Sequence, residues 1–409
     1  GQPEVIANFL DCVVLYAQTR GWLHGAETLI TQAIEAFHRQ QPELALDLLV
    51  ARGTLRIRMG RYERAREDLE SVIQSDDPGG EKHSLATAQL GACAYYQGRY
   101  DEARARLDEA IAGVGASSAG AMCRVLRGRV AMEKGRHADA EALFEAARTM
   151  AREVGDSANE RTATNQLGMT AYFRGDLERA EGLFGEVLAS ARAAGEVGLV
   201  EEAATGLGIV CEAQGAFAAA RAHYEEALAL CRESGNRRGE AYVLTVIGET
   251  FRITGELGPA RQLYADALAI AREIGADHLV GLLLGNLAYT HAAAGLLDEA
   301  EATLREVLQR YERGGSVATA LPAFISAAEV LHRRGESTRA LELLGLARAH
   351  PANRKDHTLE IERVLSMITP TVSRDALARH LDRGMQRELD TEIRKLLEPG
   401  ALGGRKKVH

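Results

Sequence analysis

A repeat of about forty residues runs through nearly the whole chain. One copy reads R-G-D-L-E-R-A from Arg174 to Ala180, and related phrases recur before and after it. The glycine of this phrase returns every 40 residues from Gly135 to Gly335, and before Gly135 the spacing is 39, 38 and 37 residues. Self-similarity at such a period indicates an array of small units that stack on one another. The nine glycines are Gly21, Gly60, Gly98, Gly135, Gly175, Gly215, Gly255, Gly295 and Gly335.

Each unit has the pattern of two helices joined by a tight turn. An alanine stands five residues after the turn glycine and a large apolar residue four residues further on, as Ala180 and Phe184 do after Gly175. In the middle units another glycine, such as Gly168, precedes the turn by seven residues and lies inside a helical pattern. Because a mid-helix glycine costs about 1 kcal/mol relative to alanine, we expect it to allow close helix packing. Glycines suited to a left-handed helix end close the second helices: Gly155, Gly195, Gly235 and Gly275.

The order Leu167-Gly168, Gly175, Ala180, Phe184 resembles the tetratricopeptide repeat (TPR), and similar units cover roughly residues 5 to 350. Two features depart from the family: Thr164 stands where a large aromatic residue is usual, and 40 residues exceeds the usual period of about 34. The resemblance implies an all-α fold, an α-solenoid of about nine helix-turn-helix units that form a right-handed superhelix.

The repeat pattern ends after Pro351, so we predict that the chain has three parts. The repeat array covers residues 1–350, and C-terminal capping helices follow over residues 351–399. Within that second part we expect helices at about 357–367, 374–382 and 385–397. Residues 400–409, with two glycines and a basic run, are expected to form a flexible tail.

Composition argues against several classes of protein. The net charge of −9, from 58 acidic and 49 basic residues, disfavours a nucleic acid or an anionic membrane as partner. The five cysteines form no C-x-x-C pair, so neither a disulfide framework nor a zinc site is predicted. No apolar run approaches the roughly 20 residues of a membrane helix, and the first residues do not resemble a signal peptide. We therefore expect a cytoplasmic protein, and the opening Gly1 suggests a fragment of a longer chain.

The sequence contains no signature of catalysis. The P-loop pattern, H-E-x-x-H and G-x-S-x-G are all missing, as is any metal-spaced cluster of histidine and cysteine. We predict that this chain is not an enzyme and has no catalytic residue, cofactor or metal. Six arginines between Arg52 and Arg66 allow two interpretations, a patch for phosphate or an acidic partner, or solvated helix and turn positions.

The first helix of each unit carries a second stripe of side chains. Leu167, Gly168 and Ala171 share the face that packs on the partner helix, so Asn165 and Tyr172 share another. We call the latter positions and their equivalents in other units the first-helix stripe. The TPR resemblance implies that this stripe lines a concave groove, although its tyrosines could instead pack against neighbouring repeats. The predicted partner-binding residues are Asn165, Met169, Tyr172, Thr205, Tyr242, Thr245, Glu249, Arg252, Tyr289, Glu329 and His332.

The closing phrase A-L-E-L-L-G-L-A-R-A-H-P-A-N, from Ala340 to Asn353, adds a more specific resemblance. With the 40-residue units it resembles the C-terminal sensor regions of bacterial STAND-type signal-transduction ATPases. The resemblance implies a sensor that binds a protein or peptide in its groove, with an ATPase module of the same parent chain as a second candidate partner. A constitutive adaptor or scaffold, and an intracellular receptor for signalling peptides, are the alternatives.

Overall fold

The computed structural model describes Val13 and residues 23–75, 81–312, 317–350 and 355–403. These residues form twenty α-helices and one 3-10 helix, and no strand occurs among them. The all-α fold of helix-turn-helix repeats is therefore confirmed. The turn glycine Gly21 and the first helix of the first unit lie outside the described residues.

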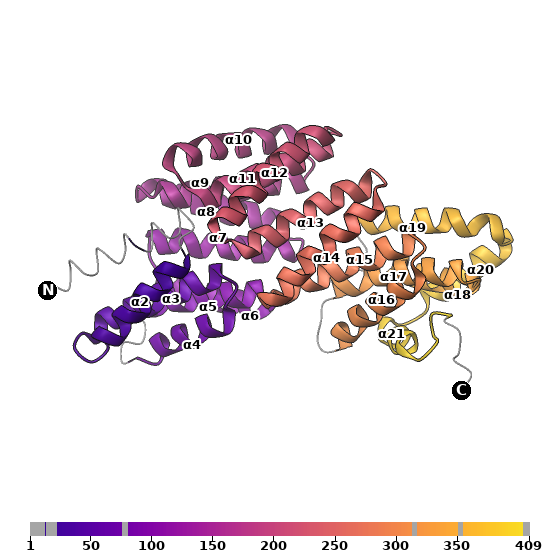
Figure 1. Cartoon of the computed structure of the whole chain (residues 1–409), viewed down its shortest axis with the longest axis horizontal. Coiled ribbons are helices and arrows are strands. Elements are labelled where there is room, and N and C mark those ends of the chain that lie inside the picture. Colours follow the sequence, from indigo (N-terminus) through magenta and orange to yellow (C-terminus); the bar gives the residue numbers. More distant parts are fainter. Residues whose placement is uncertain (1–12, 14–22, 76–80, 313–316, 351–354, 404–409) are drawn as a thin grey trace. The chain divides into compact units, whose positions relative to one another are not determined.

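The helices alternate between the first and the second member of each repeat (Figure 1). The described first helices are α3 (Pro42–Arg58), α5 (Glu81–Tyr96), α7 (Ser118–Glu133), α9 (Ser157–Phe173), α11 (Val197–Ala213), α13 (Arg237–Ile253), α15 (Asp277–Ala293) and α17 (Val317–Arg333). The second helices are α2 (Leu23–Phe37), α4 (Tyr62–Ile73), α6 (Tyr100–Gly113), α8 (His137–Glu153), α10 (Leu177–Ala194), α12 (Phe217–Ser234), α14 (Leu257–Glu273), α16 (Leu297–Glu312) and α18 (Ser337–Ala349). The C-terminal segment holds α19 (Lys355–Ile368), the 3-10 helix Thr369–Thr371, α20 (Arg374–Met385) and α21 (Leu389–Leu397).

Two kinds of glycine set the geometry of each repeat. The turn glycines from Gly60 to Gly335 all have φ between 70° and 89°, which a residue with a side chain adopts at a cost. The mid-helix glycines lie against the large apolar residue of the second helix. A Cβ on Gly208 would come within 2.3 Å of the Tyr224 ring, and one on Gly128 within 2.4 Å of the Phe144 ring. The expected close packing at these glycines is confirmed.

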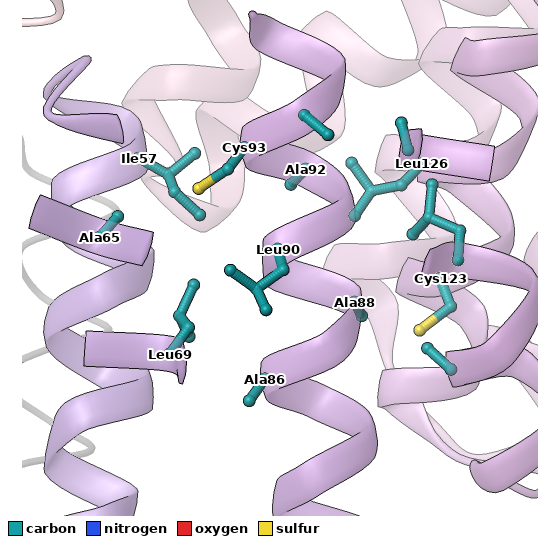
Figure 2. Packing of buried hydrophobic residues seen from close by; sticks show 14 of the residues in the cluster. Ile57, Ala65, Leu69, Ala86, Ala88, Leu90, Ala92, Cys93, Cys123 and Leu126 are labelled. Carbon is teal, nitrogen blue, oxygen red and sulfur yellow. The ribbon is translucent and has the colours of Figure 1, made fainter. Parts of the chain in front are cut away.

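The chain divides into two compact units, Gly1–Thr250 with Ala269–His278 (unit 1) and Phe251–Leu268 with Leu279–His409 (unit 2). In unit 1 the buried side chains of each first helix contact both neighbouring repeats. Figure 2 shows α5 doing so, with Leu90 facing Leu69 of α4, and with Ala88 turned towards Cys123 and Leu126 of α7. The apolar clusters of this unit thus extend across adjacent repeats, which is how a solenoid buries faces that no single repeat can bury alone.

In unit 2 the C-terminal helices pack closely on the last repeat. Gly345 of α18 and Gly384 of α20 bring the two backbones into contact, since a Cβ on Gly345 would lie 2.2 Å from the carbonyl oxygen of Leu381. Further on, Leu402 is buried and its carbonyl oxygen accepts a hydrogen bond from Arg334 at 2.9 Å. Residues 400–403 are thus packed where a flexible tail was predicted, because the apolar Ala401-Leu402 pair finds a place on the last repeat. Residues 404–409 lie outside the described part of the chain.

Candidate ligand-binding surface

Within unit 1, polar and aromatic side chains from six first helices meet in one place. Their register explains why: they stand on the face turned away from the second helices, so successive repeats present them on the same side. We call this set the arginine–tyrosine cluster. Its members are Arg58 of α3, Tyr96 of α5, Arg129 of α7, Asn165 of α9, Glu202 of α11 and Arg238 of α13.

Tyr96 is at the centre of the cluster. The guanidinium carbon of Arg238 lies 4.2 Å from the centroid of the Tyr96 ring, and Nη1 of Arg129 donates to the Tyr96 hydroxyl at 3.4 Å. The rings of Tyr62 and Tyr95 lie 6.0 Å and 5.1 Å from that of Tyr96, one nearly parallel and one edge-on. Aromatic faces attract guanidinium groups, so the Tyr96 ring helps to hold Arg238 in place.

Glu202 is the carboxylate of the cluster. Its Oε2 accepts from Nη2 of Arg129 at 3.3 Å and from Nδ2 of Asn165 at 3.2 Å. The neighbouring Glu201 is engaged elsewhere, because its side chain accepts hydrogen bonds from Ser234 at 2.8 Å and Asn236 at 2.6 Å. Glu202 therefore forms an ion pair with Arg129, and the charges of both Glu202 and Glu201 act on Arg58.

The pKa values show that positive charge dominates around Tyr96. Burial by itself would raise the pKa of Tyr96, but Arg238 and Arg129 outweigh it and lower the pKa below its ordinary value. The pKa of Arg58 is also lowered, first by burial and then by Arg238, against the opposing effects of Glu202 and Glu201. The pKa values of Arg129 and Arg238 are raised instead, because Glu202 and the nearby tyrosines outweigh burial. Arg58 is thus the arginine of the cluster for which a further negative charge would be most favourable.

Several buried polar atoms of this region have no hydrogen-bond partner among the described residues. They are Oδ1 of Asn165, the hydroxyl of Tyr62 and Nε of Arg129. Asn165 is only 4% exposed and Tyr62 only 3%. A buried polar atom without a partner costs about 1–3 kcal/mol, so a ligand that formed hydrogen bonds with these atoms would recover that cost.

The other predicted partner-binding residues of unit 1 differ in how far they are buried. Met169 and Tyr172 are half-buried on the first-helix stripe, and Tyr242 is 40% exposed. Burial, Glu212 and Glu249 raise the pKa of Tyr172, so the predicted Glu249 lies on the same surface.

Thr205 and Thr245 are buried. Each hydroxyl donates to the carbonyl oxygen four residues earlier, at 2.7 Å to Glu201 and 2.7 Å to Ala241. The helix backbone therefore satisfies both hydroxyls.

In unit 2, three predicted residues form a second cluster around Tyr289. The guanidinium carbons of Arg252 and Arg363 lie 4.7 Å and 4.8 Å from the centroid of the Tyr289 ring. Glu329, whose side chain is fully buried, accepts from Arg363 at 2.5 Å and from Arg333 at 2.8 Å. Since Arg363 belongs to α19, the C-terminal segment itself contacts this part of the stripe. His332, also predicted, contacts the Ser337 hydroxyl at 2.9 Å across the turn that follows α17.

Sequence reasoning did not place Arg58, Tyr96, Arg129 or Arg238 on the first-helix stripe, although Arg58 is one of the six arginines interpreted as a possible patch for phosphate or an acidic partner. The period contained a signal for three of them, because it can be followed towards the N-terminus as well. Counting back 40 residues from Met169 leads to Arg129. Counting back from Phe173 by 40, 37 and 38 residues passes through Tyr96 to Arg58. Arg238 stands one helical turn before the predicted Tyr242 and outside the predicted stripe positions.

The arginines between Arg52 and Arg66 fit neither interpretation as a group. Arg52 and Arg56 are largely buried and both pair with Asp68, at 2.7 Å each. Arg56 also pairs with Glu27 at 2.9 Å, and Arg61 pairs with the same carboxylate. These side chains fasten α3 to α2 and α4, whereas Arg58 points to the other face of α3 and joins the arginine–tyrosine cluster.

Among the residues that the structure describes, no group of three or more His, Cys, Asp or Glu side chains is placed to hold a metal ion. Burial raises the pKa of Cys93 to about 12 and that of Cys123 to about 11, so both thiols stay protonated at neutral pH. No described helix combines the length and the apolar character that crossing a membrane requires.

Comparison with known families identifies the repeats as tetratricopeptide repeats. A family model described as the MalT-like TPR region matches residues 121–390, and a tetratricopeptide repeat model matches residues 84–109. A search of curated protein sequences finds no match.

Several solved structures share the fold. A Rap protein complexed with Competence and Sporulation Factor has 11% identity and a TM-score of 0.57, over 86% of this chain and 99% of that one. A STAND protein with a tetratricopeptide repeat sensor, from Pyrococcus horikoshii, has 14% identity and a TM-score of 0.51, over 87% of this chain and 55% of that one. The apo quorum sensor NprR from B. thuringiensis has 14% identity and a TM-score of 0.51, over 85% and 96%. At these identities the likeness shows the fold alone.

Proposed function

This chain belongs to the family of MalT-like TPR regions, and we propose that it is a non-catalytic sensor domain that binds a protein or peptide on its first-helix stripe. We further propose that it works as part of a larger signal-transducing ATPase in the cytoplasm. The family assignment and the shared fold with a STAND protein that has a TPR sensor support this proposal.

The arginine–tyrosine cluster is the observation that carries the proposal. It joins side chains from six successive first helices, from α3 to α13, and it contains buried polar atoms that lack partners. A ligand bound there would touch several repeats at once, and would therefore favour one arrangement of those repeats over another. A difference in affinity between two arrangements is what a sensor requires.

The test is capture of the trigger by this chain and by a variant of the stripe. Asn165→Ala combined with Tyr242→Ala removes one buried amide and one exposed ring from the proposed surface. We expect this variant to lose trigger binding, and the full-length parent protein that carries it to lose its response. The control is Glu178→Ala combined with Glu225→Ala, because both side chains are exposed on second helices of the same unit. Unchanged binding by the stripe variant would refute the proposed surface.

A further inference from the structure

We propose that Arg58, Arg129 and Arg238 together form a binding site for an oxyanion, the carboxylate or phosphate group of a ligand. This inference deepens the proposed function and rests on it for the identity of the ligand as a signal. The presence of the anion site itself can be tested without knowing that signal.

Three guanidinium groups from three different helices approach one another here. Arg129 and Arg238 both contact Tyr96, one at its hydroxyl and the other at its ring face. Arg58 reaches the start of α11, where its Nη2 lies 2.7 Å from the position of a Cβ on Gly198. The glycine therefore leaves room for this guanidinium beside Glu202. Guanidinium groups bind carboxylate and phosphate through paired N–H donors, which makes arginine the usual residue for such sites.

The charges of the cluster do not balance. Arg58 and Arg238 form no ion pair within 4.0 Å with any described residue, and Arg129 has only Glu202, at 3.3 Å. Arg58 is the least compensated of the three, because burial and Arg238 lower its pKa and the carboxylates of Glu202 and Glu201 offset only part of that effect. An oxyanion would supply the missing negative charge.

The neighbouring arginines show what a structural arginine looks like in this protein. Arg52 and Arg56 lie on the same helix as Arg58, and both form close ion pairs with Asp68 at 2.7 Å. Arg58 has no such partner, although it stands only two residues from Arg56. The helix thus carries paired arginines on one face and an unpaired one on the other. A purely structural role explains the first kind and leaves the second unexplained.

The experiment measures binding of two small probes to the whole chain by calorimetry and by thermal melting. Inorganic phosphate tests the phosphate group, and N-acetyl-aspartate tests the carboxylate, each against sodium chloride at the same ionic strength. We expect at least one probe to bind the wild-type chain and to raise its Tm. The combined variant Arg58→Gln and Arg238→Gln should weaken that binding by about tenfold or more, since it removes two of the three guanidinium groups that would bind the anion. Arg104→Gln, an exposed position on α6, should bind like wild type.

The Tm of the unliganded variants provides a second readout. Arg58 forms no ion pair and its pKa is lowered, so Arg58→Gln alone should leave that Tm unchanged or raise it. A clear fall would assign Arg58 a structural role and overturn the proposal. Equal effects of a probe on wild type and on the double variant, or no effect of either probe, would overturn it as well. These outcomes would not touch the proposed sensor function, which depends on trigger capture by the Asn165 and Tyr242 variant.

Discussion

At the scale of single residues, the packing of each repeat depends on a glycine in the first helix, because glycine has no Cβ. Gly208 has no Cβ, so the ring of Tyr224 from the second helix lies directly against the backbone of α11. Tyr224 is 1% exposed and therefore cannot move aside into solvent. The mid-helix glycine of this repeat is therefore needed for direct contact between the backbone of the first helix and the aromatic ring of the second helix.

Gly208→Ala should therefore destabilise the protein. The added methyl group would lie 2.3 Å from the Tyr224 ring, and overpacking of this kind costs about 1–3 kcal/mol. Gly182→Ala is the matched control, since no atom lies within 4 Å of its added Cβ and alanine is the better helix former. Thermal melting should show a lower Tm for the first variant only. Equal Tm values for both variants would contradict this explanation of the repeat glycines.

Glu27 gives unit 1 a stability that depends on pH. Burial would raise its pKa, but the hydrogen bond from Arg56 and the charge of Arg61 outweigh burial, so the pKa lies below its ordinary value. A carboxyl group of this kind stabilises the folded state above its ordinary pKa of about 4.3, and the stabilisation is lost as pH falls. Glu27→Gln should lower the Tm at pH 7, and the difference from wild type should shrink towards pH 3. A difference that stays constant with pH would show that charge is not the cause.

At the scale of helices, α19 contacts the unit 2 part of the first-helix stripe. Its Arg363 lies on the ring of Tyr289 and pairs with Glu329, so two predicted partner-binding residues of unit 2 already have a partner within the chain. Buried polar atoms without partners occur in both clusters, since Nε of Arg363 is one of them. The arginine–tyrosine cluster differs in that Arg58 and Arg238 form no ion pair with a described residue, and we therefore place the proposed ligand site on unit 1.

Arg363→Gln should destabilise unit 2 because it leaves the fully buried carboxylate of Glu329 with Arg333 as its remaining cation. Loss of one charged hydrogen bond at a buried group predicts a cost of about 1–3 kcal/mol. Adding Glu329→Gln should recover part of that cost, which a double-mutant cycle from thermal melting would measure. Arg379→Gln, exposed on α20, should have little effect. Strictly additive costs at Arg363 and Glu329 would show that the ion pair contributes nothing.

At the scale of the whole molecule, the array is closed by a segment that does not repeat. Every residue from Leu341 to Ala347 in α18 is buried, although the second helices of the other repeats keep an exposed side. The helices that cover it are α17, α19 and α20, and Ile361, Val364 and Ile368 of α19 are themselves fully buried. A repeat array needs such a cover, because its last unit would otherwise expose an apolar face.

Ending the chain at His350 should therefore destabilise unit 2 and expose apolar surface. We expect a lower Tm and binding of the dye ANS, neither of which should appear in the full chain. The full chain with Leu359→Asp is the control, since that side chain of α19 is 67% exposed. A truncated chain with an unchanged Tm and no dye binding would show that the array is complete without these helices.

The sequence by itself was enough to predict the repeat, its two helices, the turn glycines and the reason for the mid-helix glycines. All of these depend on contacts within one unit or between adjacent units, which a fixed period keeps at fixed spacing. The period also placed Asn165 on a surface shared by several repeats, and it could have placed Arg129 there had it been followed towards the N-terminus.

Only the tertiary structure decided which of those surface residues meet. Arg238 and Tyr96 are 142 residues apart in the chain, and their contact depends on the rotation that accumulates over several repeats. Small rotations between units are set by packing and have no local signature in the sequence. The same reason applies to Arg363, whose contact with Tyr289 lies outside the repeat pattern. The scaffold therefore depends on contacts between residues close in the sequence, and the sequence alone predicts it. The candidate site depends on contacts between residues far apart in the sequence, which only the folded chain brings together.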